Sequence, residues 1–211
     1  MPRMQYSPFT SLQNLVRQRD ARERCELCGV ALSSAHRHLI EPVARKLVCA
    51  CDACALLFDS PTKTKYKRVP LDVRLLSDFQ MTDAQWESLL IPIGMAFFFK
   101  SSVQGSTLAV YPSPAGATES LLSLDSWQEI VISNPVLARM EPDVEALLVN
   151  RLDAARRPAE YYLVPIDKCY ELVGLIRSRW RGLSGGAEVW EQIRLFFDAL
   201  KMQASAEFAH A

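Results

Sequence analysis

The stretch that decides the fold is Cys25-Glu-Leu-Cys28-Gly29, followed by His36-Arg-His38 and by Cys49-Ala-Cys51-Asp-Ala-Cys54. Five of the six cysteines of the 211-residue chain lie in this stretch. Thiolates in Cys-x-x-Cys pairs are soft ligands that one tight turn directs at the same ion. Two such pairs about two dozen residues apart have the spacing of a zinc site. The stretch therefore predicts a tetrahedral metal site, with zinc as the favoured ion.

More cysteine and histidine side chains lie here than a tetrahedral site can use. We favour the set in which both pairs keep Cys-x-x-Cys geometry, namely Cys25, Cys28, Cys51 and Cys54. Cys49 is an alternate for Cys51, and His38 or His36 is an alternate in a mixed site. A four-thiolate site is closed and structural, whereas a mixed site with a weakly held position is catalytic or exchanges its metal. Each histidine is otherwise interpreted as a surface or hairpin-packing side chain.

Two other interpretations of these residues stay open. Iron in a rubredoxin-like site also suits four thiolates, although the second pair lacks the proline and glycine typical of rubredoxin-like turns. The run also loosely resembles zinc-framed His-Asn-His endonucleases, in which His38 would be the general base. The short spacing from His38 to Cys49, and the lack of a histidine or asparagine directly after the second pair, argue against a nuclease.

The residues around the cysteines predict a zinc-ribbon-like or treble-clef-like module. Gly29 frees the backbone to turn beneath the metal. Leu39-Ile40 and Leu47-Val48 are typical of two short strands around a polar turn, and the second cysteine pair leads into a helix. An amphipathic helix is expected over residues 7–23, and the polar, basic residues 60–68 are expected to be a linker.

The remainder of the chain predicts paired strands and helices. Strands are expected over 69–76, 94–100, 107–111, 145–152 and 161–165, with a rigid loop over 111–116. A Thr82–Gln85 capping box starts a helix to residue 90, and Asp125 and Asp167 are expected to cap helices to 132 and 180; a last helix covers 188–202. The predicted fold class is α+β, with the small module docked on a mostly antiparallel sheet with helices. The predicted domains are 1–60 and 61–211.

Charge is unevenly spread along a chain whose net charge is zero. The first 70 residues carry 12 Lys and Arg against 6 Asp and Glu, so the remaining residues are acidic on balance. Such asymmetry is typical of a partner surface, but it equally fits two halves that attract each other or two faces that are simply solvated. The basic surplus is too dispersed for a dedicated nucleic-acid domain. We expect only weak, non-specific nucleic-acid binding that is lost at physiological salt, and an acidic protein surface as the better partner.

The sequence shows no membrane or export signal. The longest apolar run, 89–99, is broken by Pro92 and Gly94 and is too short to cross a bilayer. The first residues lack the apolar core of a signal peptide. We therefore expect a cytoplasmic protein with reduced thiols, which favours metal binding over disulfides.

Several phrases together resemble a known family: CELCG (25–29), DAQWESLLIPIGMAFFFKSS (83–102), YPSPAGATES (111–120) and LVPIDKCYELVGLIRSRWRG (163–182). The chain resembles an uncharacterised bacterial family encoded in nickel–iron hydrogenase gene clusters. The resemblance implies an accessory role in hydrogenase assembly or operation, with a hydrogenase subunit or maturation factor as partner. It carries no known catalytic residues.

Outside the cysteine stretch, the sequence lacks a convincing catalytic set. Histidine is absent between residues 39 and 209, and no Gly-x-Ser-x-Gly, Walker or dinucleotide motif occurs. We therefore expect a non-enzymatic zinc-binding protein that acts through protein contacts. The competing expectation is an enzyme or a metal-delivery protein, in which His36, His38 and Cys49 form a labile second site beside the structural one.

Overall fold

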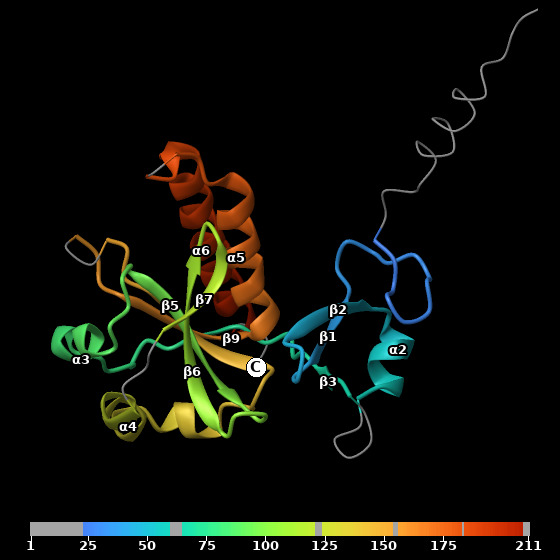
Figure 1. Cartoon of the computed structure of the whole chain (residues 1–211), viewed down its shortest axis with the longest axis horizontal. Helices are drawn as coiled ribbons and strands as arrows, with labels where there is room; N and C mark the ends of the chain where they lie inside the picture. Colours follow the sequence, from blue (N-terminus) through green and yellow to red (C-terminus); the bar gives the residue numbers. More distant parts are fainter. Residues whose placement is uncertain (1–22, 60–64, 121–123, 154–155, 183, 209–211) are drawn as a thin grey trace, which may run out of the picture.

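The computed structural model describes residues 23–59, 65–120, 124–153, 156–182 and 184–208. Two sheets organise the chain (Figure 1): a three-stranded sheet beside the cysteines and a six-stranded sheet that carries the larger core. All pairings in both sheets are antiparallel. The predicted α+β class with antiparallel sheets is therefore confirmed.

The small sheet is a hairpin with a short third strand. β1 (Arg37–Glu41) pairs with β2 (Lys46–Ala50), and β3 (Lys67–Arg68) adds to the other side of β1. The two short strands predicted around a polar turn are thus confirmed. Helix α2 (Asp52–Leu57) follows β2 directly. The division of the chain into domains at residue 60 stays a prediction.

The large sheet has the order β4-β9-β8-β5-β6-β7. Its strands are β4 (Arg74–Leu75), β5 (Met95–Ser101), β6 (Ser106–Ser113), β7 (Gly116–Ser120), β8 (Glu145–Asn150) and β9 (Glu160–Pro165). The two predicted strand pairs are hairpins, β5–β6 and β8–β9, and they meet where β5 pairs with β8.

Helices cover both faces of the large sheet. They are α3 (Asp83–Ser88), α4 (Leu124–Ser133), the 3₁₀ helix η1 (Pro135–Arg139), α5 (Ile166–Arg179) and α6 (Gly186–Phe208). Because side chains alternate along a strand, Phe97 and Phe99 pack with residues of α5 and α6. Phe98 packs on the opposite face, stacked on Trp127 of α4 at 4.8 Å between ring centroids. The predicted packing of the last two helices on the sheet is confirmed.

Local sequence signals are confirmed at some element ends and wrong at others. The capping box is present, since Thr82 accepts from the Gln85 backbone and Gln85 accepts from the Thr82 backbone. The predicted loop over 111–116 is wrong, because β6 continues to Ser113 and pairs with β7. Pro112 fits there because β5 pairs with β6 only as far as Val110, so Pro112 has a neighbouring strand on one side only.

The other helix starts also differ from the predictions. α4 begins at Leu124, so Asp125 does not precede the helix, and α6 begins at Gly186. Asp167 lies in the first turn of α5 rather than at its N-cap, which is Pro165. The extended segment over 69–76 forms a strand only at Arg74–Leu75. The helix predicted over 7–23 lies almost wholly outside the described residues, as does part of the predicted linker.

The small sheet docks on the large domain through apolar and charged contacts. Ile40 of β1 is buried in the core formed by the large sheet, α5 and α6. Lys67 of β3 donates to the buried Asp143 at 2.7 Å and to the Pro142 carbonyl at 3.1 Å. Arg45, in the β1–β2 turn, pairs with Glu119 of β7 at 3.0 Å. The cysteine-rich module is therefore held against the domain at several points.

Candidate metal centre

The first cysteine pair lies in a tight turn that the backbone itself holds closed. The Gly29 N–H donates to the Cys25 carbonyl at 2.8 Å, and Gly29 has φ +78°, a conformation that favours glycine. Glu26 then ties this turn to β2, because its backbone N–H donates to the Cys49 carbonyl and its carboxylate accepts from the Cys49 N–H. The backbone turn that the sequence predicted at Gly29 is thus present.

The second cysteine pair begins helix α2. Cys51 is the N-cap, and its sulfur accepts from the Cys54 backbone N–H at 3.5 Å. The local sequence therefore places Cys51 and Cys54 on one side of the first helical turn.

These two turns bring the favoured four sulfurs together. Those of Cys25, Cys28, Cys51 and Cys54 lie within 4.8 Å of one another, and those of Cys28 and Cys51 are 3.8 Å apart. A tetrahedral zinc with bonds of about 2.3 Å needs sulfurs about 3.8 Å apart. Four cysteines at this spacing form a potential metal site that would leave no coordination position for water or substrate.

The thiols of this cluster differ in acidity. Burial opposes ionisation of Cys25, but backbone N–H groups that point at its sulfur outweigh burial and lower its pKa to about 6. Burial and the neighbouring cysteines raise the pKa of Cys54 to about 12. One thiolate therefore forms readily and suppresses the ionisation of its neighbours. A bound cation would reverse this suppression by stabilising all four thiolates.

The three remaining candidates form a second group. His36, His38 and Cys49 each offer a ligand atom, and these atoms lie within 4.8 Å of one another. The sequence offered the three both as alternates for one site and as a labile second site, and the structure groups them apart from the four-cysteine cluster. Asp167 was missed as a neighbour of this group: its carboxylate lies 2.8 Å from His38 Nδ1. Asp167 is 129 residues further along the chain, so no local signal could have indicated the contact.

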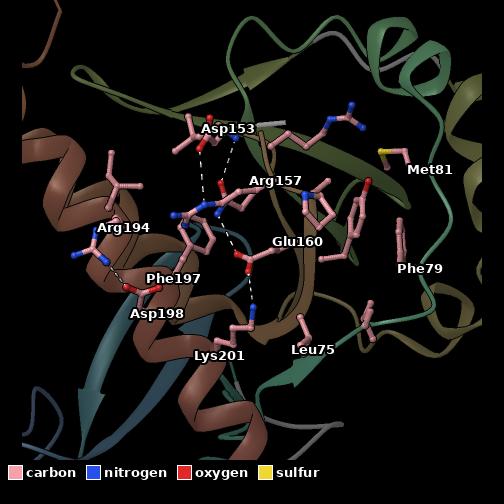
Figure 2. A pocket seen from close by; sticks show the side chains of 18 of the residues that line it. Leu75, Phe79, Met81, Asp153, Arg157, Glu160, Arg194, Phe197, Asp198 and Lys201 are labelled. Carbon is pink, nitrogen blue, oxygen red and sulfur yellow. Dashed lines mark hydrogen bonds and ion pairs between the residues drawn. The ribbon is translucent and has the colours of Figure 1, made fainter. Parts of the chain in front are cut away.

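A separate cleft of about 1040 Å³ lies between β4, the β8–β9 connection and α6 (Figure 2). Its charged side chains pair with one another: Glu160 with Lys201 at 3.1 Å, and Arg194 with Asp198 at 2.6 Å. Phe79 stacks on Tyr161 on the apolar side. Because the pairing satisfies these charges within the cleft, the cleft indicates no particular ligand.

The last cysteine stands apart from both groups. Cys169 is fully buried in α5, where burial raises its pKa well above the ordinary value. Its surroundings are the apolar core between α5 and the large sheet. Cys169 is therefore a small buried side chain of the core.

The fold and the cysteine cluster define an α+β protein with a potential metal-binding module at its N-terminal side. The chain matches the model of DUF5947, a family of unknown function, over residues 24–204, and it belongs to this family. No curated protein and no solved structure matches the chain. In the part of the chain that the structure describes, no helix is both long enough and apolar enough to cross a bilayer.

Proposed function

We propose that this protein is a non-enzymatic zinc-binding accessory protein whose four-cysteine site is structural. The observation that carries the proposal is the approach of the four sulfurs to tetrahedral spacing, with each Cys-x-x-Cys pair supplying two of them. Zinc is favoured over iron because zinc is not redox-active and commonly forms closed four-thiolate sites in small modules. A rubredoxin-like iron site is the alternative for the same four ligands.

The proposed partner is a hydrogenase subunit or maturation factor, met in the cytoplasm. Support for this context comes from the resemblance of the sequence phrases to a family encoded beside nickel–iron hydrogenases. On the module itself, α2 presents Leu56 and Leu57, which are 67% and 73% exposed. Adjacent exposed apolar side chains on a metal-stapled helix suit a protein contact better than solvent.

The metal part of the proposal is tested by elemental analysis of the protein purified from its host without added metal. One zinc per chain that resists dialysis is expected, and it should be lost when Cys25 and Cys54 are replaced by serine. A red, iron-containing sample would establish the rubredoxin-like alternative. A preparation that holds neither metal, and gains none when zinc is added, would end the proposal.

The partner part is tested by affinity capture from the native host with the tagged full-length chain. We expect hydrogenase subunits or maturation factors in the eluate. The double variant Leu56→Glu/Leu57→Glu should lose them, whereas Ile132→Glu is a matched control, because Ile132 is equally exposed but lies on α4. If the same proteins are captured by both variants, the α2 surface is not the contact; if no hydrogenase-related protein is captured by the unaltered chain, the context is wrong.

A further inference from the structure

We infer that His36, His38 and Cys49 form a second metal site, open at one coordination position and distinct from the four-cysteine site. The inference is independent of the hydrogenase partner. It concerns a divalent transition-metal ion of borderline softness, such as zinc, cobalt or nickel, for which imidazole and thiolate are suitable ligands.

The backbone of the β1–β2 hairpin brings the three side chains together. His38 is the direct cross-strand partner of Cys49, so both side chains project from the same face of the small sheet. His36 is two residues before His38 and therefore faces the same side. Its ring lies 4.8 Å from that of His38 between centroids. Three ligand side chains, two imidazoles and one thiol, thus converge on this face.

This face of the hairpin is turned toward the large domain. Ile40 and Leu47, the next residues on the same face, pack against the core that includes α5. The opposite face carries Leu39 and Val48, which pack with Cys25 and Cys54. Figure 1 shows the hairpin beside the N-terminal end of α5. The two groups of candidate ligands are therefore placed differently. The four cysteines lie within the module, and His36, His38 and Cys49 lie where the module meets the large domain.

Hydrogen bonds leave one nitrogen of each ring available to a metal. His36 Nδ1 lies 3.0 Å from the Ser33 carbonyl, and His38 Nδ1 lies 2.8 Å from the Asp167 carboxylate. Both partners can only accept, so each Nδ1 carries the proton and donates it. In a neutral ring the Nε2 lone pair is then free to bind a metal, as in histidine ligands whose other nitrogen is oriented by a carbonyl or carboxylate.

His36 supplies the observation that an ordinary histidine contact does not explain. Its side chain is only 7% exposed. Its Nε2 is buried and has no hydrogen-bond partner among the residues that the structure describes. A protonated His38 would balance the charge of Asp167 without a metal, but it would leave the buried His36 Nε2 unsatisfied beside the Cys49 sulfur. A metal ion bound by these two atoms removes the deficit.

Asp167 is the positioning residue of the proposed site. Its side chain is 15% exposed, and its second carboxylate oxygen is also buried without a partner in the described chain. A largely buried carboxylate is costly unless positive charge lies nearby. A divalent ion on the far side of the His38 ring supplies that charge through a carboxylate–histidine–metal arrangement. Because Asp167 belongs to α5, metal binding would couple the module to the large domain.

The ligand count defines what such a site can do. A tetrahedral ion needs its ligand atoms about 3.3–3.8 Å apart, so the three atoms would close around it with shifts of about an ångström. Three protein ligands leave the fourth position for water, a small anion or a donor from a partner protein. An open site of this kind holds its ion more weakly than the four-thiolate site and can exchange it.

The test is a metal titration of the purified full-length protein that already carries its structural zinc. Added Co²⁺ is followed by its visible bands and its thiolate-to-metal absorption, and bound metal is counted after gel filtration. We expect one additional cobalt per chain, removed by a mild chelator while the zinc remains. The double variant His36→Ala/His38→Ala and the single variant Cys49→Ser should each lose the additional ion and keep the zinc.

Two further variants separate a metal site from a merely structural cluster. Cys169→Ala removes a thiol outside both groups and should bind the additional cobalt as the unaltered chain does. Asp167→Ala should keep one additional ion but weaken its affinity by about 10–100-fold, as expected when a carboxylate behind a ligand histidine is lost. The inference is overturned if the unaltered protein takes up no additional cobalt, or if it does so equally well without His36, His38 and Cys49.

Discussion

Removal of the proposed zinc should unfold the cysteine-rich module while the large domain stays folded. The module has its own small core around Cys25, and within the described residues the large buried aliphatic side chains of this core are Leu32, Leu39 and Val48. Burying each contributes about 1.5–3 kcal/mol, so the three together contribute about 5–9 kcal/mol. A structural zinc contributes about 10–16 kcal/mol in small zinc modules. The metal is therefore the larger stabilising contribution.

Hydrogen exchange measured by mass spectrometry, before and after chelation, tests this ranking. Peptides that cover β1 and β2 should exchange more than about a thousandfold faster without metal, because each 1.4 kcal/mol of opening free energy corresponds to about a factor of ten. Peptides from β5, β8 and β9, whose core is separate from the cysteines, should change by less than about tenfold. Restoring zinc should restore protection.

The reasoning is refuted by either of two results on samples whose zinc loss has been verified. Unchanged protection of β1 and β2 would mean that the contacts of Ile40 and Lys67 with the large domain hold the hairpin without metal. Equal loss of protection in both sheets would mean that the module and the domain unfold as one cooperative unit. Chelation of the Cys169→Ala variant provides the control, since it should behave as the unaltered chain does.

Three further predictions concern pH, charge and packing. Zinc uptake at pH 7 should release about two or more protons, and the zinc affinity should increase as pH rises, because the pKa values of Cys28 and Cys54 are raised in the metal-free cluster. Calorimetry in buffers of different ionisation enthalpy measures the proton release, and a pH-independent affinity would contradict the prediction. Lys67→Met should destabilise the protein by about 3 kcal/mol in denaturant unfolding, because it leaves the buried Asp143 carboxylate without its cation. The control Lys65→Met breaks the more exposed pair with Glu41 and should cost less than about 1 kcal/mol. Gly94→Ala should lower the free energy of unfolding by about 1–3 kcal/mol, because the added Cβ would lie 2.9 Å from the Arg151 backbone. Gly174→Ala, in an open position on α5, should be neutral or stabilising by up to about 1 kcal/mol.

Features that depend on neighbours in the chain were predictable. The Cys-x-x-Cys turns, the capping box at Thr82 and the β5–β6 hairpin each form from residues a few positions apart, so spacing and turn chemistry are sufficient to indicate them. The grouping of Cys25, Cys28, Cys51 and Cys54 followed for the same reason, since two Cys-x-x-Cys pairs predict local turns that share one metal ion. The α+β class followed from the pairing of strands.

Features that depend on contacts between distant segments were not predictable from the pattern. The Pro-rich segment 111–116, which contains the end of β6 and the first residue of β7, looks like a loop in sequence. It extends the sheet because β6 beyond Val110 pairs with β7 alone. Asp167 looks like a helix cap, yet its carboxylate lies against His38.

The separation of the histidines from the four cysteines is the main result that only the tertiary structure decided. Sequence spacing placed all the candidate ligands in one short stretch and left their division open. The alternation of side chains across the β1–β2 hairpin places His38 and Cys49 on the face from which His38 reaches Asp167 of α5, and places Leu39 and Val48 on the face that packs with Cys25 and Cys54. The face that meets the large domain is decided by the docking of Ile40 into a core whose most distant member is Ala204 of α6. No local pattern encodes that contact.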